Sequence, residues 1–128
     1  MVFGDHYAQV LSRAAIGLGL VTKRFAELHT TRTFEIPACG TALATEQNPE
    51  IDRVFRAGDA VFFKDSGDLS AQCVQLLQHP EQLRQVTERG FRRVLESGCH
   101  NDAIVGQVLE SLGYQCQVCG DVDAAKDD

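Results

Sequence analysis

Short apolar runs alternate with helical patterns over the first 65 residues, and this alternation constrains the fold more than any other feature of the chain. The runs at residues 16–20, 41–45 and 60–63 have the length and residue types of short buried strands. A helical pattern separates each run from the next, and strands joined through a helix lie parallel in one sheet. The sequence therefore predicts an α/β protein built on a parallel sheet with crossover helices.

Residues with strong end preferences mark where the helices among these strands begin and end. Asp5 is expected to cap a first helix, and Thr30 or Thr31 a second one. Gly40 then ends the second helix, because glycine readily adopts the left-handed backbone of a helix end. Pro49 suits the first turn of a third helix.

Beyond residue 63 the pattern is helical only. Asp68, Pro80 and Asp102 each favour the start of a helix, and Gly113 closes the last of the three. Apolar residues recur at helical spacing in all three helices, and those of the middle helix are expected to point inward. The three stripes consist of Leu69, Cys73, Leu76 and Leu77, then Leu83, Val86, Phe91, Val94 and Leu95, and finally Ile104, Val105, Val108, Leu109 and Leu112.

Residues 1–113 are expected to form one partial domain of this class, followed by a flexible acidic tail at residues 114–128. Three strands are few for a parallel sheet, and the residues before the first helix leave no room for a preceding strand and helix. We therefore expect the second half of a larger α/β domain. Such a sheet has an open edge and an uncovered apolar face, through which copies of the chain are expected to associate.

The charge balance and the cysteines limit the partners and the compartment. Twelve Lys and Arg against eighteen Asp and Glu give a net charge of −6, which argues against nucleic acid or an anionic membrane as the main partner. No apolar run approaches the roughly 18 residues of a membrane span, and the N-terminus does not resemble a signal peptide. Five cysteines, an odd number, favour reduced thiols in the cytoplasm over a disulfide framework.

Residues 27–40 form the most informative segment for chemistry, because two glutamates flank the expected helix start. A helix start offers backbone N–H groups and a partial positive charge, which both suit a phosphate. Glu35, about one turn into the helix, can accept two hydrogen bonds from a vicinal diol such as a ribose. Glu27 lies in the loop on the far side of the phosphate. The candidate ligand-binding residues are Glu27, His29, Thr30, Thr31, Arg32 and Glu35.

The same residues also permit an interpretation without a ligand. A Thr-Thr pair with a glutamate downstream is a good helix start in any protein. His29 is as compatible with a structural hydrogen bond as with a bond to a phosphate or sugar. Cys116 and Cys119 form a lone C-x-x-C motif, and zinc would need two further ligands, for which Cys99 and His100 are the nearest candidates in sequence.

Residues 29–40 read His-Thr-Thr-Arg-Thr-Phe-Glu-Ile-Pro-Ala-Cys-Gly, and this stretch resembles the signature of the group 1 glycosyltransferases. The closest resemblance is to the spore-maturation-protein-like branch of that group. Residues 18–20, 55–63, 79–82 and 89–94 also resemble segments of the family. The similarity covers roughly residues 4 to 112, which is most of the chain.

This resemblance implies the C-terminal, donor-binding domain of a GT-B glycosyltransferase, with a Rossmann-like fold. In the wider family, a pair of glutamates separated by seven residues lies at the nucleotide sugar. Glu35 would be the second member and hold the ribose hydroxyls, while Glu27 would be the first and face the donor sugar as the candidate catalytic residue. Thr30 and Thr31 would face the diphosphate beside Arg32. The resemblance implies no metal and no other cofactor.

The implied function is transfer of a sugar, with retention of configuration, from a nucleotide-sugar donor to an acceptor that the sequence does not identify. Residues 28–30 depart from the wider group, which often has a Gly-rich stretch after the first glutamate. The family's diphosphate-clamping residues usually come from the first half of the donor domain, so the isolated chain is expected to be a poor catalyst. The alternatives are a non-catalytic truncated or split module, which binds nucleotide or pairs with a partner chain, and a small zinc or redox protein.

Overall fold

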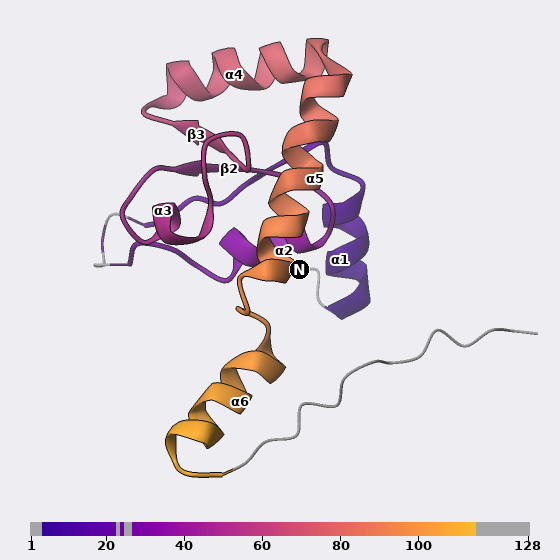
Figure 1. Cartoon of the computed structure of the whole chain (residues 1–128). Coiled ribbons are helices and arrows are strands. Elements are labelled where there is room, and N and C mark those ends of the chain that lie inside the picture. Colours follow the sequence, from indigo (N-terminus) through magenta and orange to yellow (C-terminus); the bar gives the residue numbers. More distant parts are fainter. Residues whose placement is uncertain (1–3, 23, 25–26, 115–128) are drawn as a thin grey trace, which may run out of the picture. The chain divides into compact units, whose positions relative to one another are not determined.

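The structure, a computed structural model, describes residues 4–22, 24 and 27–114. Its centre is a three-stranded parallel sheet in the order β1 (Ile16–Leu18), β2 (Ala42–Glu46), β3 (Val61–Phe63) (Figure 1). Ile16 lies opposite Ala42, and Ala44 lies opposite Val61. The predicted α/β fold with a parallel sheet is therefore confirmed. β1 is shorter than predicted and ends at Leu18, although the amide of the next residue still donates to the Ala44 carbonyl.

Two crossover helices connect these strands, and a further helix precedes them. α1 (Gly4–Ser12) leads into β1, α2 (Arg32–Ala38) joins β1 to β2, and α3 (Ile51–Val54) joins β2 to β3. One face of the sheet packs against α2 and α3. Its buried core contains Ile36, Leu43, Ile51, Phe55 and Ala60.

Gly17 permits the close approach of α2 to this face. A Cβ atom at Gly17 would lie 2.7 Å from Cγ2 of Ile36. Because Gly17 has no side chain, the Ile36 side chain of α2 packs directly against the backbone of β1.

The opposite face of the sheet is covered by α4 (Ser66–Gln78) and α5 (Pro80–Glu96). Leu69 and Leu76 of α4 and Val86 of α5 pack against a second buried cluster, which consists of Ala44, Val61 and Phe63. The side chains of residues 42–45 in β2 are buried on both faces. The expected uncovered apolar face is therefore wrong for the centre of the sheet. Exposed apolar residues remain at its β1 side, where Leu18 is 46% and Leu20 is 50% exposed.

α5 packs against both core clusters, and Figure 1 shows it passing over α2, which it contacts. Its residue Val94 packs against the first core cluster, whereas Val86 packs against the second. Gly90 makes this crossing possible, because a Cβ there would lie 2.6 Å from the backbone oxygen of Asp59 and 3.5 Å from Pro37. His79 is both the C-cap of α4 and the N-cap of α5, so that this single residue separates the two helices.

The predicted helix caps Asp68 and Asp5 are wrong. α4 is capped by Asp65, which lies two residues after β3 and about one turn before Asp68. Its carboxylate accepts a hydrogen bond from the amide of Asp68 at 2.9 Å. α1 begins at Gly4, which places Asp5 in its first turn, where a carboxylate still favours the helix dipole.

The chain divides into two compact units, Met1–Ser97 and Gly98–Asp128. In the second unit, α6 (Asn101–Ser111) is capped by His100, whose Nδ1 accepts a bond from the amide of Ala103 at 3.2 Å. Asp102, the predicted cap, lies in the first turn instead. The predicted acidic tail, apart from Tyr114, lies outside the described residues.

Several apolar side chains of the predicted stripes are exposed rather than buried. In α5, the expected inward residues Phe91 and Leu95 are 40% and 60% exposed, because these positions point away from the sheet that the helix covers. Leu77, in the apolar stripe of α4, is 56% exposed. Within the second unit, the stripe of α6 is likewise exposed at Ile104, Val105, Val108 and Leu112.

Candidate functional site

A pocket of about 190 Å³ lies just beyond the carboxyl ends of β1 and β2. Ligands of parallel α/β sheets bind in crevices at this edge, because the loops that follow the strands converge there. Glu27, the candidate catalytic residue, lines the pocket, and Glu46 at the end of β2 adds a second carboxylate. The lining consists of Val21, Thr22, Glu27, Leu28, Glu46, Gln47 and Asn48.

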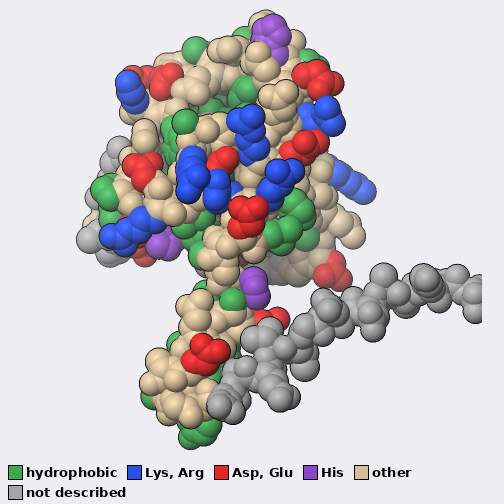
Figure 2. Space-filling view, viewed as in Figure 1, with side chains coloured by type: hydrophobic (Ala, Val, Ile, Leu, Met, Phe, Trp, Pro, Cys, Tyr) green, Lys and Arg blue, Asp and Glu red, His purple; other side chains and the backbone are tan. Residues whose placement is uncertain are grey.

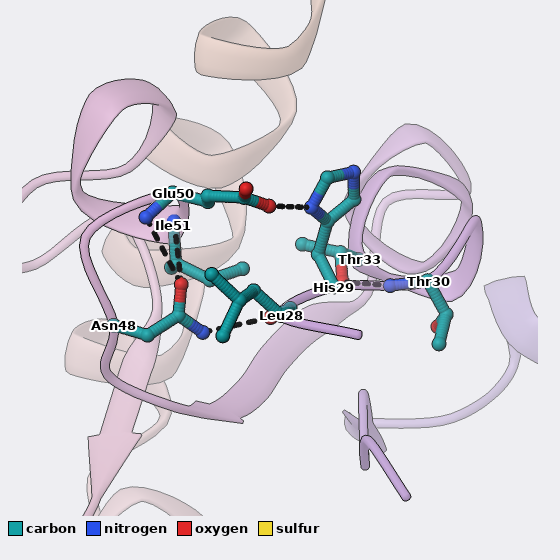
Figure 3. Close-up of polar contacts among 7 residues, drawn as sticks. All are labelled: Leu28, His29, Thr30, Thr33, Asn48, Glu50 and Ile51. Carbon is teal, nitrogen blue, oxygen red and sulfur yellow. Dashed lines mark hydrogen bonds and ion pairs between the residues drawn. The ribbon is translucent and has the colours of Figure 1, made fainter. Parts of the chain in front are cut away.

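Asn48 holds the loop that carries Glu27 (Figure 3). Its Nδ2 donates to the backbone oxygen of Leu28 at 2.7 Å. Its Oδ1 accepts from the amides of Glu50 and Ile51 at 3.0 Å and 3.1 Å, which caps the start of α3. One side chain therefore connects the pocket loop to the turn after β2. The sequence interpretation missed Asn48, although an asparagine directly before Pro49 is a recognisable helix-start signal.

His29 makes a structural contact in this loop. Its Nδ1 lies 2.8 Å from Oε2 of Glu50 (Figure 3). Its ring packs edge-on against Phe34, with 5.7 Å between the ring centres. Both members of the His29–Glu50 pair are about half exposed, so the pair contributes modestly to stability. The sequence left two roles open for His29, a structural hydrogen bond and a bond to a ligand. The contact with Glu50 supplies a partner for the structural role.

The start of α2 differs in detail from the expected phosphate cradle. Thr31 precedes the helix with a helical backbone, and its side chain makes no capping hydrogen bond. The amides of Thr33 and Phe34 donate to the carbonyl oxygens of Thr30 and Thr31, each at 3.0 Å. These amides therefore already have partners. Oγ1 of Thr30 is buried and has no hydrogen-bond partner among the described residues.

Glu35 is directed toward α1 and does not line the pocket with Glu27. Its Oε2 accepts a hydrogen bond from the hydroxyl of Tyr7 at 3.1 Å. Burial, and then the hydrogen bond and charge of Glu35, raise the pKa of Tyr7, while Arg32 acts in the opposite direction. Burial and the nearby Glu35 carboxylate also raise the pKa of the Cys39 thiol. This contact between Tyr7 and Glu35 was not predicted from the sequence.

A second hollow, of about 210 Å³, lies beside α5 and is lined by arginines. The sequence predicts a solvated basic strip at Arg89, Arg92 and Arg93, and Figure 2 shows basic side chains gathered over α5 with acidic ones between them. Arg93 departs from that prediction, because Nε lies 3.0 Å from the buried Asp59 carboxylate. None of the predicted ligand-binding residues lines this hollow.

Within the described part of the chain, no three His, Cys, Asp or Glu side chains are grouped to bind a metal ion. Cys116 and Cys119 lie outside that part, and Cys39 and Cys73 are free thiols. None of the described helices combines the length and the apolar character that a membrane crossing requires.

Comparison with known proteins identifies one family. The family model described as glycosyl transferase-like matches residues 1–110. No curated protein and no solved structure matches the chain. The family match covers the sheet and all of the predicted site residues, and it confirms the resemblance at the level of the family, while the spore-maturation-protein-like branch stays a prediction. The chain belongs to the glycosyl transferase-like family.

Proposed function

We propose that the chain binds the nucleotide-sugar donor of a glycosyl-transfer reaction, as the C-terminal donor domain of a GT-B enzyme. The observation that carries this proposal is the pocket at the carboxyl ends of β1 and β2, which Glu27 lines inside the segment matched by the family model. Sugar hydroxyls are hydrogen-bond donors, and the two carboxylates of Glu27 and Glu46 are strong acceptors. The pocket therefore suits the sugar of the donor.

The nucleotide part of the donor is assigned to the other predicted residues. Glu35 accepts hydrogen bonds from the ribose hydroxyls, and Arg32 with Thr30 and Thr31 faces the diphosphate. Thr30 reaches a ligand only after its buried hydroxyl turns outward. The assignment of these residues is supported by their place in the family match rather than by a shared cavity with Glu27.

Catalysis requires more than these residues supply. A leaving diphosphate is stabilised by several positioned charges, and Arg32 is the only permanent positive charge among the predicted site residues. We therefore assign donor binding to this chain, and we assign the remaining charges and the acceptor site to another domain or partner chain. The alternative is a module that only binds nucleotide. Such a module would bind nucleotide but show no sugar transfer after such a partner is added.

The compartment that we propose is the cytoplasm. Free thiols at Cys39 and Cys73 agree with a reducing environment, as does the odd number of cysteines in the chain. Fluorescence microscopy of the tagged chain in its native cells is expected to give a diffuse cytoplasmic signal, and an extracellular signal would contradict the proposal.

Calorimetric titration of the full chain tests the proposed function. The ligands are uridine, guanosine and adenosine diphosphates and their hexose conjugates. Glu35→Gln is expected to weaken binding of both ligand classes about tenfold, because one carboxylate acceptor becomes a donor. Glu27→Gln is expected to weaken the sugar conjugate more than the bare nucleotide, because Glu27 faces the sugar.

Glu110→Gln in α6 is the matched control and should leave both affinities unchanged. Failure of every ligand to bind the parent chain would contradict the proposal. So would a Glu35→Gln chain that binds normally but melts several degrees lower, since that result describes a purely structural glutamate.

A further inference from the structure

The hydrogen bond between Tyr7 and Glu35 joins two segments that are 28 residues apart in the chain. Tyr7 belongs to α1, and Glu35 lies one turn into α2. The bond is partly buried, with 3.1 Å between the Tyr7 hydroxyl and Oε2. A glutamate side chain has three rotatable bonds, and a donor at one oxygen restricts the direction of the whole carboxylate.

The bond leaves acceptor capacity on Glu35. An ionised carboxylate offers about four lone-pair sites on its two oxygens, and Tyr7 occupies one of them. Oε1 and the second lone pair of Oε2 are left to accept hydroxyl groups. Burial and Glu35 raise the pKa of Tyr7, and the positive charge of Arg32 acts against that rise.

α1 is itself anchored, so Tyr7 has a fixed position. The hydroxyl of Thr41 donates to the backbone oxygen of Leu11, and Leu11 packs against the buried core cluster of α2 and β2. The amide of Ala42 donates to the oxygen of Ala15 at 3.4 Å, which ties the segment after α1 to the start of β2. The tyrosine therefore presents its hydroxyl from a packed helix rather than from a free segment.

We propose that Tyr7 is a positioning residue for donor binding, whose hydroxyl holds the Glu35 carboxylate in the direction that accepts the ribose hydroxyls of a nucleoside diphosphate. This inference rests on the proposed function of Glu35. It adds that recognition of the ribose depends on α1, a helix outside the residues 27–40 that carry the predicted site. A competing role has the opposite sign: a Tyr7 hydroxyl that occupies the place of a ribose hydroxyl would have to be displaced by the ligand.

Tyr7→Phe removes the hydroxyl and keeps the ring, and it provides the test in the full chain. The ligands are whichever of uridine, guanosine or adenosine diphosphate the parent binds most tightly, and the 2′,3′-dideoxy analogue of that nucleotide. Tyr7→Phe should weaken the ribose nucleotide about threefold to tenfold, the effect of losing one hydrogen bond. Binding of the dideoxy analogue should change less than about twofold, because it offers no hydroxyl to Glu35.

Two controls accompany this variant. Tyr114→Phe removes the only other tyrosine hydroxyl of the chain, from the second compact unit, and should change neither affinity. Tyr7→Phe added to Glu35→Gln should cost less than about twofold, since the two residues act through one contact. Partial unfolding of a variant lowers the calorimetric stoichiometry and leaves the ratio of the two affinities readable.

The outcomes separate the two proposals. Equal losses for the ribose and dideoxy nucleotides would overturn the positioning role, because they describe a structural tyrosine. Tighter binding by Tyr7→Phe would overturn it in favour of displacement by the ligand. If the parent chain binds the ribose nucleotide more tightly than the dideoxy analogue, and the Tyr7→Phe variant shows the same difference, this inference alone is contradicted. A parent chain that binds no nucleotide contradicts the proposed function and this inference together.

Discussion

Asp59 and Arg93 connect the turn before β3 to α5 through one carboxylate oxygen. Oδ2 of Asp59 lies 3.0 Å from Nε of Arg93 and accepts a second bond from the amide of Arg56 at 2.9 Å. The Asp59 side chain is 9% exposed and the Arg93 side chain 27%, so water screens this pair less than an ordinary surface pair.

Arg93→Met should therefore destabilise the fold through the unpaired Asp59 carboxylate. We expect a loss of about 1–3 kcal/mol in the free energy of unfolding, less than for a fully buried pair because Arg93 is partly exposed. The measurement is urea denaturation. Arg84→Met on the same helix is the control, because its bonds to Glu81 and Glu88 are exposed, and it should cost less than about 1 kcal/mol. Equal losses in the two variants would contradict the distinction.

Two glycines within helices should respond oppositely to alanine. Gly90→Ala places a Cβ 2.6 Å from the backbone oxygen of Asp59, which must move, and should cost about 1–3 kcal/mol. At Gly106, a Cβ meets no atom within 4 Å beyond its own helix among the described residues, and alanine should stabilise the helix by about 0.5–1 kcal/mol. Thermal unfolding of both variants checks this pair, and a stable Gly90→Ala chain would mean that α5 packs less closely than described.

The raised pKa of Tyr7 makes its contribution to stability depend on alkaline pH. The folded state favours the protonated hydroxyl, so the contribution is complete below the unfolded value of 10.0 and is lost as pH rises through the raised pKa of the folded state. Melting temperatures of the parent and Tyr7→Phe chains, followed from about pH 8 to about pH 11.5, should differ at the lower end and converge at the upper end. A difference that stays constant would show that the hydroxyl of Tyr7 keeps its proton throughout.

Asn48 performs two tasks that substitution can separate. Asn48→Ala loses both the cap of α3 and the bond to Leu28, and should cost about 1 kcal/mol. Asn48→Asp keeps a capping oxygen and loses only the donor to Leu28, so its stability should fall less. Hydrogen exchange should quicken at residues 27–29 in both variants. Unchanged exchange there would mean that Asn48 does not hold the loop.

Self-association through the sheet is also expected. Within the described residues no strand pairs with the outer side of β1 or β3, and Leu18 and Leu20 are exposed beside β1. Light scattering should detect dimers or larger species that decrease in Leu20→Lys. Leu77→Lys, on an exposed face of α4, is the control and should leave association unchanged. A clean monomer of the parent chain at roughly 10⁻⁴ M would exclude this mode of association, because edge pairing at useful strength implies a lower dissociation constant.

The sheet was predictable from the sequence because local patterns specify it. Each strand is a short apolar run with a helix before the next run, and a right-handed crossover then leaves little choice of arrangement. The exposure of apolar side chains in the helices was less predictable. Phe91 and Leu95 repeat at helical spacing with Val94, yet only Val94 reaches a core cluster, because the direction in which α5 crosses the sheet decides which part of the stripe is buried.

The candidate site was predictable in part. Glu27 and Glu35 lie in one recognisable segment, and Glu27 lines a pocket at the expected edge of the sheet. Their partners were not predictable, because Tyr7 meets Glu35 across 28 residues and Asn48 meets Leu28 across 20. Such contacts depend on tertiary packing, which helix or strand periodicity does not predict.

The shared position of His79 sets the length of the chain between α4 and α5. One residue inserted between Gln78 and Pro80 would turn α5 by about 100° about its axis. Gly90 and Arg93 would then leave the turn before β3, so the insertion would cost both the close packing at Asp59 and its ion pair. Loop grafts and domain insertions in this chain therefore belong elsewhere, for example at Gly98 between the two compact units, where added length leaves α5 in register with the sheet.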